Sequence, residues 1–164
     1  MKNPLSDAGE TKPQRLWPVH CVWHSAGAKI IPEIHADDID LLVKKGMDVR
    51  VEMYSAFADA FGNKCVETKG VNVDVAATLK EKGVTDVYVV GLAGDYCVKS
   101  TAIDAAREGF KSWVIEEGVK SVDPGQGWED AQKEMEDVGI RVVSVDGPEV
   151  KLVKELGALP DHVE

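Results

Sequence analysis

The chain has 164 residues and a formal net charge of −10 at pH 7, with a pI of about 4.9. This length predicts one domain with a hydrophobic core of its own. Its acidic residues are spread along the chain, whereas nucleic acids and anionic membranes bind basic faces, so we expect neither as a partner. No apolar run approaches the roughly 20 residues that a membrane-spanning helix needs.

Cysteine usage indicates a reducing compartment. Cys21, Cys65 and Cys97 are widely spaced, which argues against a disulfide framework. The first residues lack the apolar stretch of a secretory signal. We therefore expect a cytoplasmic protein.

Strands and helices are predicted to alternate after a polar loop over residues 1–15. The apolar runs predict strands over 39–43, 87–91, 113–115 and 140–145. Between them, a helix is predicted over 73–82, capped by Asn72 and ended by Gly83, then one over 97–108, ended by Gly109, and one over 129–138, ended by Gly139. A final helix is opened by Pro148. This alternation predicts an α/β fold with a parallel sheet and helices on both faces. Ligands of such sheets bind beyond the carboxyl ends of the strands, where Lys45 and Cys97 fall.

The most informative segment runs from Val87 to Ala102. An apolar, β-branched run stops at glycines, and Cys97 follows at the start of a small-residue helix. A helix dipole favours a thiolate at this place, and nearby backbone N–H groups stabilise an oxyanion. Cys97 is therefore a candidate nucleophile for acyl transfer, the alternative being an unreactive core cysteine.

Two further segments carry candidate site residues. In the segment 16–22, Trp17 offers an apolar wall and His20 an imidazole for a metal or a proton. One histidine does not make a metal site, and His24 would pair with His20 only in a helix, so His20 is otherwise a hydrogen-bonded structural residue. Lys45 either points into solvent or, if close to Cys97, stabilises the thiolate and shuttles a proton.

In their order and spacing, three motifs resemble the nicotinamidases of the isochorismatase-like cysteine hydrolases. The motifs are LWPVHCV at 16–22, KG at 45–46 with YSAF at 54–57, and VVGLAGDYCVKSTA at 89–102. The resemblance implies a three-layer α/β/α, Rossmann-like fold and hydrolysis of nicotinamide to nicotinate and ammonia through a cysteine thioester. It divides the chain into the polar loop 1–15, the C-terminal portion of the hydrolase domain over 16–147, and a C-terminal helix and tail over 148–164.

The resemblance also assigns catalytic roles. Cys97 matches the nucleophile, Lys45 matches the catalytic lysine, and His20 matches one histidine ligand of the family's metal, usually zinc. The pyridine nitrogen of nicotinamide gives such a metal a purpose, which favours nicotinamide over other small amides.

The pocket residues follow from the same resemblance. Trp17, Tyr54 and Tyr96 match the aromatic residues that wall the pyridine pocket. The backbone N–H groups of Ala93 and Cys97 match the oxyanion hole, and the peptide before Ala93 matches a bond that is cis in relatives.

The chain also departs from the family pattern. Neither the strand with the catalytic aspartate (D-x-Q-x-D-F) nor the Asp-x-His pair of metal ligands has a counterpart, so the domain is expected to be incomplete at its N-terminus. We therefore expect weak or absent zinc binding and little or no amidase activity. The alternatives are a non-catalytic binding or regulatory relative, or a hydrolase of another small amide.

The absent strands would leave a gap in the sheet between residues 39–43 and 87–91. Unpaired strand edges are unfavourable. One alternative is a chain that stays partly disordered. We expect instead either a rearranged sheet, in which these two strands pair directly, or an intertwined homo-oligomer.

Overall fold

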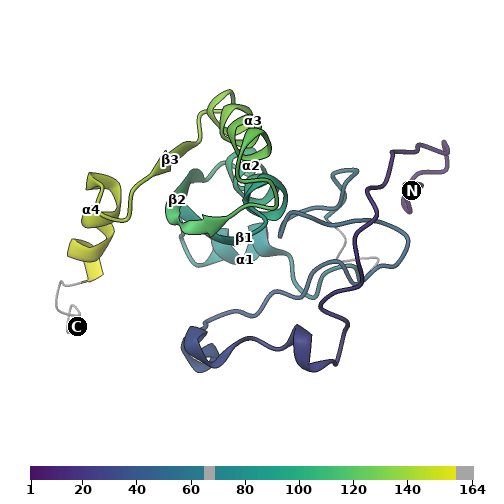
Figure 1. The fold of residues 1–164 in the computed structure, drawn as a ribbon, viewed down its shortest axis with the longest axis horizontal. Helices are drawn as coiled ribbons and strands as arrows, with labels where there is room; N and C mark the ends of the chain where they lie inside the picture. The colour runs from purple at the N-terminus through teal and green to yellow at the C-terminus, as the bar shows by residue number, and fades with distance from the viewer. Residues whose placement is uncertain (65–68, 158–164) are drawn as a thin grey trace.

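The computed structural model describes residues 1–64 and 69–157. Its sheet is parallel, in the order β1-β2-β3, and consists of β1 (Asp86–Leu92), β2 (Lys111–Lys120) and β3 (Arg141–Val143). The helices are α1 (Val75–Glu81), α2 (Lys99–Arg107), α3 (Gln126–Glu136) and α4 (Pro148–Gly157) (Figure 1). The predicted α/β fold with a parallel sheet is confirmed.

Helices lie on both faces of the sheet. Val89 of β1 faces the cluster that packs against α2 and α3. Tyr88, the next residue in the alternation of the strand, points to the opposite face. There its hydroxyl donates a hydrogen bond to the backbone oxygen of Glu149 in α4, at 3.2 Å.

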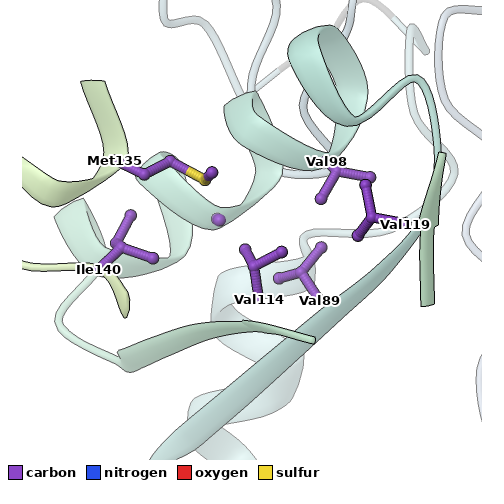
Figure 2. Packing of buried hydrophobic residues seen from close by; sticks show 7 residues of the cluster. Val89, Val98, Val114, Val119, Met135 and Ile140 are labelled. Atoms are coloured by element: carbon purple, nitrogen blue, oxygen red, sulfur yellow. The ribbon is translucent and has the colours of Figure 1, made fainter. Parts of the chain in front are cut away.

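The main core is the cluster between the sheet and helices α2 and α3 (Figure 2). Its buried members are Val89, Val98, Ala102, Val114, Val119, Met135 and Ile140. Full burial of an aliphatic side chain of this size contributes about 1.5–3 kcal/mol, so this cluster anchors the strand that leads to Cys97.

The first half of the chain is largely irregular (Figure 1). The strand predicted over 39–43 is wrong, because this segment has no strand partner in the described chain. Its backbone is instead held by the side chain of Asn72, which accepts from the N–H of Lys44 (2.6 Å) and donates to the oxygen of Leu42 (3.0 Å). An apolar run alone does not make a strand when its hydrogen bonds go elsewhere.

The same contact explains an error in the predicted start of α1. Because the Asn72 side chain is engaged with residues 42–44, Asp74 caps the helix and accepts the N–H of Ala77 at 2.9 Å. Helix α1 therefore begins at Val75. Its predicted end is confirmed by Gly83, which has a φ of +70°.

The remaining elements match their predictions with shifted bounds. Strand β2 is much longer than the predicted 113–115, with an irregularity opposite the interval between Val89 and Gly91, and β3 is shorter than the predicted 140–145. Pro148 opens α4 as predicted. No helix in the described ranges is long and apolar enough to span a membrane. Cys65 and the predicted tail after Gly157 lie outside the described residues.

Candidate active site

Cys97 lies in a wide helical turn (Gly94–Val98) that connects β1 to α2. The turn begins after Ala93, which has a left-handed conformation (φ 60°, ψ 61°). The oxygen of Ala93 accepts the N–H groups of Tyr96 (3.0 Å) and Val98 (3.2 Å). The predicted start of the helix at Cys97 is therefore three residues late.

The conformation of Ala93 also corrects an expectation about its peptide bond. The Leu92–Ala93 peptide is trans, so the expected cis bond is wrong. The chain reverses through the positive φ of Ala93, a conformation that non-glycine residues adopt rarely.

Lys45 lies beside the sulfur. Its Nζ is 3.7 Å from Cys97 Sγ and donates a hydrogen bond to the backbone oxygen of Met53 at 2.8 Å. Both Lys45 and Cys97 are half-buried, so the alternative of a lysine pointing freely into solvent is wrong. An ammonium group at this distance stabilises negative charge on the sulfur.

Trp17, Tyr54 and Tyr96 form an aromatic wall. Ring centroids are 4.9 Å apart for Trp17 and Tyr96, and 5.4 Å apart for the two tyrosines. The indole Nε1 of Trp17 donates to the Tyr54 hydroxyl at 3.0 Å. Burial raises the pKa of the Tyr54 phenol, and this hydrogen bond opposes the increase.

Arg15 packs on the outer side of this wall. Its guanidinium lies 4.7 Å from the ring centroid of Trp17 and 5.4 Å from that of Tyr96, and it donates to the Tyr96 hydroxyl. No sequence pattern predicts this contact, because Arg15 falls in a polar segment and is 81 residues from Tyr96. Cation–π contacts of this kind restrain the aromatic rings.

One cavity of about 390 Å³ brings all seven predicted site residues together: Trp17, His20, Lys45, Tyr54, Ala93, Tyr96 and Cys97. This volume suits a small aromatic ligand. The residues that the sequence analysis missed in the lining are Cys21, Gly46, Glu52, Met53 and Val122. Among the described lining residues, Glu52 is the only carboxylate.

His20 reaches the cavity from an exposed position. Its Nδ1 lies 2.6 Å from the oxygen of Pro18, an acceptor, so Nδ1 donates there and Nε2 is the ring nitrogen left for a ligand. The segment from His20 to His24 is not helical, so the helical pairing with His24 has no basis. Within residues 1–64 and 69–157, no three His, Cys, Asp or Glu side chains are placed to hold a metal ion. These residues therefore do not fit a zinc site.

Comparison with known proteins agrees with this geometry. The sequence matches the Isochorismatase domain family over residues 3–147. It is 36% identical over 132 residues to a nicotinamidase of Acinetobacter baylyi, covering 80% of this chain and 58% of that relative. The chain thus spans less than two thirds of the length of this relative.

Solved structures show the same similarity. PnC1 from L. infantum in complex with nicotinate matches with a TM-score of 0.70 and 32% identity, over 79% of this chain and 61% of the other. Pyrazinamidase of Pyrococcus horikoshii in complex with zinc matches with a TM-score of 0.60 and 32% identity, over 79% and 63% of the two chains.

Proposed function

Because the chain belongs to the isochorismatase-domain family, we propose that it hydrolyses nicotinamide to nicotinate and ammonia, with Cys97 as the nucleophile. One observation carries this proposal: Lys45 Nζ lies 3.7 Å from Cys97 Sγ in the cavity that Trp17, Tyr54 and Tyr96 line. A lysine ammonium beside a cysteine nucleophile, next to an aromatic wall, suits an aromatic carboxamide. The nicotinamidase of A. baylyi and the nicotinate complex of the L. infantum protein support the choice of substrate.

The proposed reaction has two steps. The Cys97 thiolate attacks the carboxamide carbon, and the backbone N–H groups of Ala93 and Cys97 receive the oxyanion. The carbon–nitrogen bond then breaks, and Lys45 gives its proton to the departing ammonia. Water attacks the thioester carbon next, which releases nicotinate and returns the sulfur, while Lys45 regains a proton from that water.

The described residues include only some of the catalytic and metal-binding residues expected from the family. Cys97 has Lys45 as its hydrogen-bonding partner there, and no described carboxylate hydrogen-bonds to the sulfur. We therefore expect slow turnover. We derive no step through zinc, and we expect the purified protein to hold far less than one zinc per chain when analysed by elemental mass spectrometry.

We further propose the reducing cytoplasm as its location and a homo-oligomer as its assembly. The described cysteines, Cys21 and Cys97, are both free thiols, and Cys21 is exposed. Such thiols persist in a reducing compartment.

The experiment measures ammonia and nicotinate after incubation of the full chain with nicotinamide. We expect slow formation of both products, abolished in Cys97→Ala and reduced by about 100-fold in Lys45→Met, in line with the loss of a general acid–base group. Arg107→Met, on the exposed side of α2, is the matched control and should keep the wild-type rate. Product formation that survives Cys97→Ala would contradict the proposed nucleophile.

Titration calorimetry separates the alternatives. Nicotinamide binding without any product in the wild-type protein would overturn the hydrolase proposal in favour of a binding relative. Benzamide has the same shape without the ring nitrogen, so hydrolysis of benzamide at the faster rate would indicate another amide substrate.

A further inference from the structure

The turn that carries Cys97 is docked onto the connection between β2 and α3. Asp95, two residues before Cys97, is only 6% exposed. Its Oδ1 accepts the N–H of Val122 at 2.9 Å, and its Oδ2 accepts the N–H of Asp123 at 3.0 Å. A buried carboxylate needs such partners, and charge-assisted hydrogen bonds to backbone N–H groups are the stronger kind.

Gly94 is the second contact of the same docking surface. A Cβ built on Gly94 would lie 2.5 Å from both Ser121 Oγ and Val119 Cγ1, and 2.9 Å from Trp128 Cζ3. Only glycine therefore permits this approach of the turn to the end of β2. Two consecutive residues of the turn thus contact the same connection. Asp95 accepts hydrogen bonds from it, and Gly94 allows it to approach closely because it has no side chain.

The connection also takes part in the candidate site. Val122, whose N–H is held by Asp95, lines the same cavity as Cys97 and Lys45. The Val122 side chain is otherwise half exposed, on a loop without regular structure. The Asp95 carboxylate therefore joins one wall of the cavity to the turn that presents the sulfur.

We propose that Asp95 is a positioning residue that holds Cys97 at its distance from Lys45 and sets the Val122 wall of the cavity. Its contribution to nicotinamide turnover rests on the function proposed above, but its effect on the sulfur does not. An asparagine at position 95 keeps one acceptor oxygen and presents an N–H₂ donor to the second backbone N–H. Two N–H donors that face each other form no hydrogen bond, so the connection moves away and no longer stabilises the turn.

The test compares Asp95→Asn with Asp59→Asn. Asp59 is equally buried, at 6% exposure, and its Oδ1 also accepts two backbone N–H groups, those of Phe61 and Asn63. It does not line the Cys97 cavity. The readout is the rate at which iodoacetamide alkylates Cys97, resolved by peptide mass spectrometry, with N-acetylcysteine in the same solution as the reference thiol.

We expect Asp95→Asn to slow alkylation of Cys97 relative to N-acetylcysteine by about fivefold or more, because the sulfur loses its fixed place beside the ammonium. Asp59→Asn should leave the ratio within about twofold of wild type, as expected for a site outside the cavity. Where turnover is measurable, Asp95→Asn should lower kcat by about tenfold with a smaller change in KM. An unchanged ratio in a folded Asp95→Asn protein, or an equal loss in both variants, overturns the proposal.

Hydrogen exchange on the wild-type protein gives an independent readout if Asp95→Asn does not fold. The amides of Val122 and Asp123 should exchange about 100-fold or more slowly than free loop amides, since both are held by a buried carboxylate. Exchange at the rate of an unprotected loop would overturn the proposal. Because alkylation and exchange need no substrate, both outcomes are distinguishable from a failure of the nicotinamidase proposal.

Discussion

At the scale of single residues, Tyr54 connects the aromatic wall to the charged part of the cavity. Its hydroxyl accepts the Trp17 indole N–H at 3.0 Å. Burial is the largest cause that raises the pKa of its phenol, and the negative charge of Glu52 raises it further, whereas the Trp17 hydrogen bond lowers it. The pKa of Tyr54 therefore responds separately to the Trp17 hydrogen bond and to the charge of Glu52.

We predict opposite shifts for two substitutions. Glu52→Gln removes a negative charge and should lower the pKa of Tyr54. Trp17→Phe removes the hydrogen-bond donor and should raise it. Absorbance titration of the phenolate measures both changes, with Tyr54→Phe identifying the signal. Shifts of the same sign in the two variants would contradict this assignment of causes.

The same raised pKa has a defined effect on stability. A raised pKa means that the fold favours the neutral phenol, so the contribution is fully present below the unfolded value of about 10 and is lost as pH rises through the folded pKa. Urea unfolding should therefore show that the stability difference between the wild-type protein and Tyr54→Phe changes only in alkaline solution.

Where a motif carries the residue, the sequence predicts which residues lie together, and their catalytic roles stay predictions. Cys97, Lys45 and Trp17 were placed in one site because their segments have the order and spacing of a known family, and the cavity contains all three. Arg15 and Glu52 were missed because their contacts depend on how distant irregular segments meet. A local sequence pattern does not predict such a long-range contact.

At the scale of elements, predictions were right where local signals determine the structure. Helices α2 and α3 are each followed by a glycine with positive φ, Gly109 and Gly139, and both ends were predicted to within about two residues. The segment 39–43 failed for a tertiary reason, because Asn72 binds the backbone around Leu42 and Lys44. A strand exists only when another strand accepts its hydrogen bonds.

Helices α1 and α2 are linked by a charged cluster, which gives a prediction at this scale. Glu108, at the C-terminal end of α2, lies 2.9 Å from Lys80 of α1 and 2.9 Å from Lys64. The hydrogen bonds from Lys80 and Lys64 lower the pKa of the Glu108 carboxyl. The two lysine side chains are about half exposed, so solvent weakens the interaction.

We predict that Glu108→Gln lowers the free energy of unfolding by about 0.5–1 kcal/mol at pH 7, the range of an exposed ion-pair network. A lowered pKa means that this contribution is present above the unfolded pKa and is lost as pH falls through the folded one. Urea unfolding of the two proteins should therefore converge as pH falls through the folded pKa of Glu108. Glu81→Gln, at an exposed position of α1, is the control and should stay close to wild type. A difference that does not shrink as pH is lowered would argue against the ionic origin.

At the scale of the whole molecule, the sheet ends at β1 within the described chain. The order β1-β2-β3 gives β1 a strand neighbour on one side only. The predicted direct pairing of 39–43 with β1 is wrong, since that segment is irregular (Figure 1). Of the two expectations for the gap in the sheet, the homo-oligomer therefore stays as a prediction.

Exposed apolar side chains on β1 and in the irregular first half support self-association. On β1, Val90 is 53% and Leu92 is 78% exposed, and in the irregular first half Leu16 and Val19 are 87% and 90% exposed. Edge strands and apolar surfaces of this kind favour pairing with another chain. A second copy offers the same edge and the same surface, so a symmetric contact is available to it.

We predict that the purified chain is a dimer or larger at micromolar concentration and that Leu92→Lys shifts it towards the monomer. A lysine at an edge strand opposes pairing because burying its charge at the contact is unfavourable. Light scattering coupled to size-exclusion chromatography measures the mass across a dilution series. Leu156→Lys changes a leucine of α4 that is also more than half exposed, and it should leave the mass unchanged. A wild-type chain that is monomeric at every concentration would contradict association through β1, and an equal shift in both variants would place the contact elsewhere.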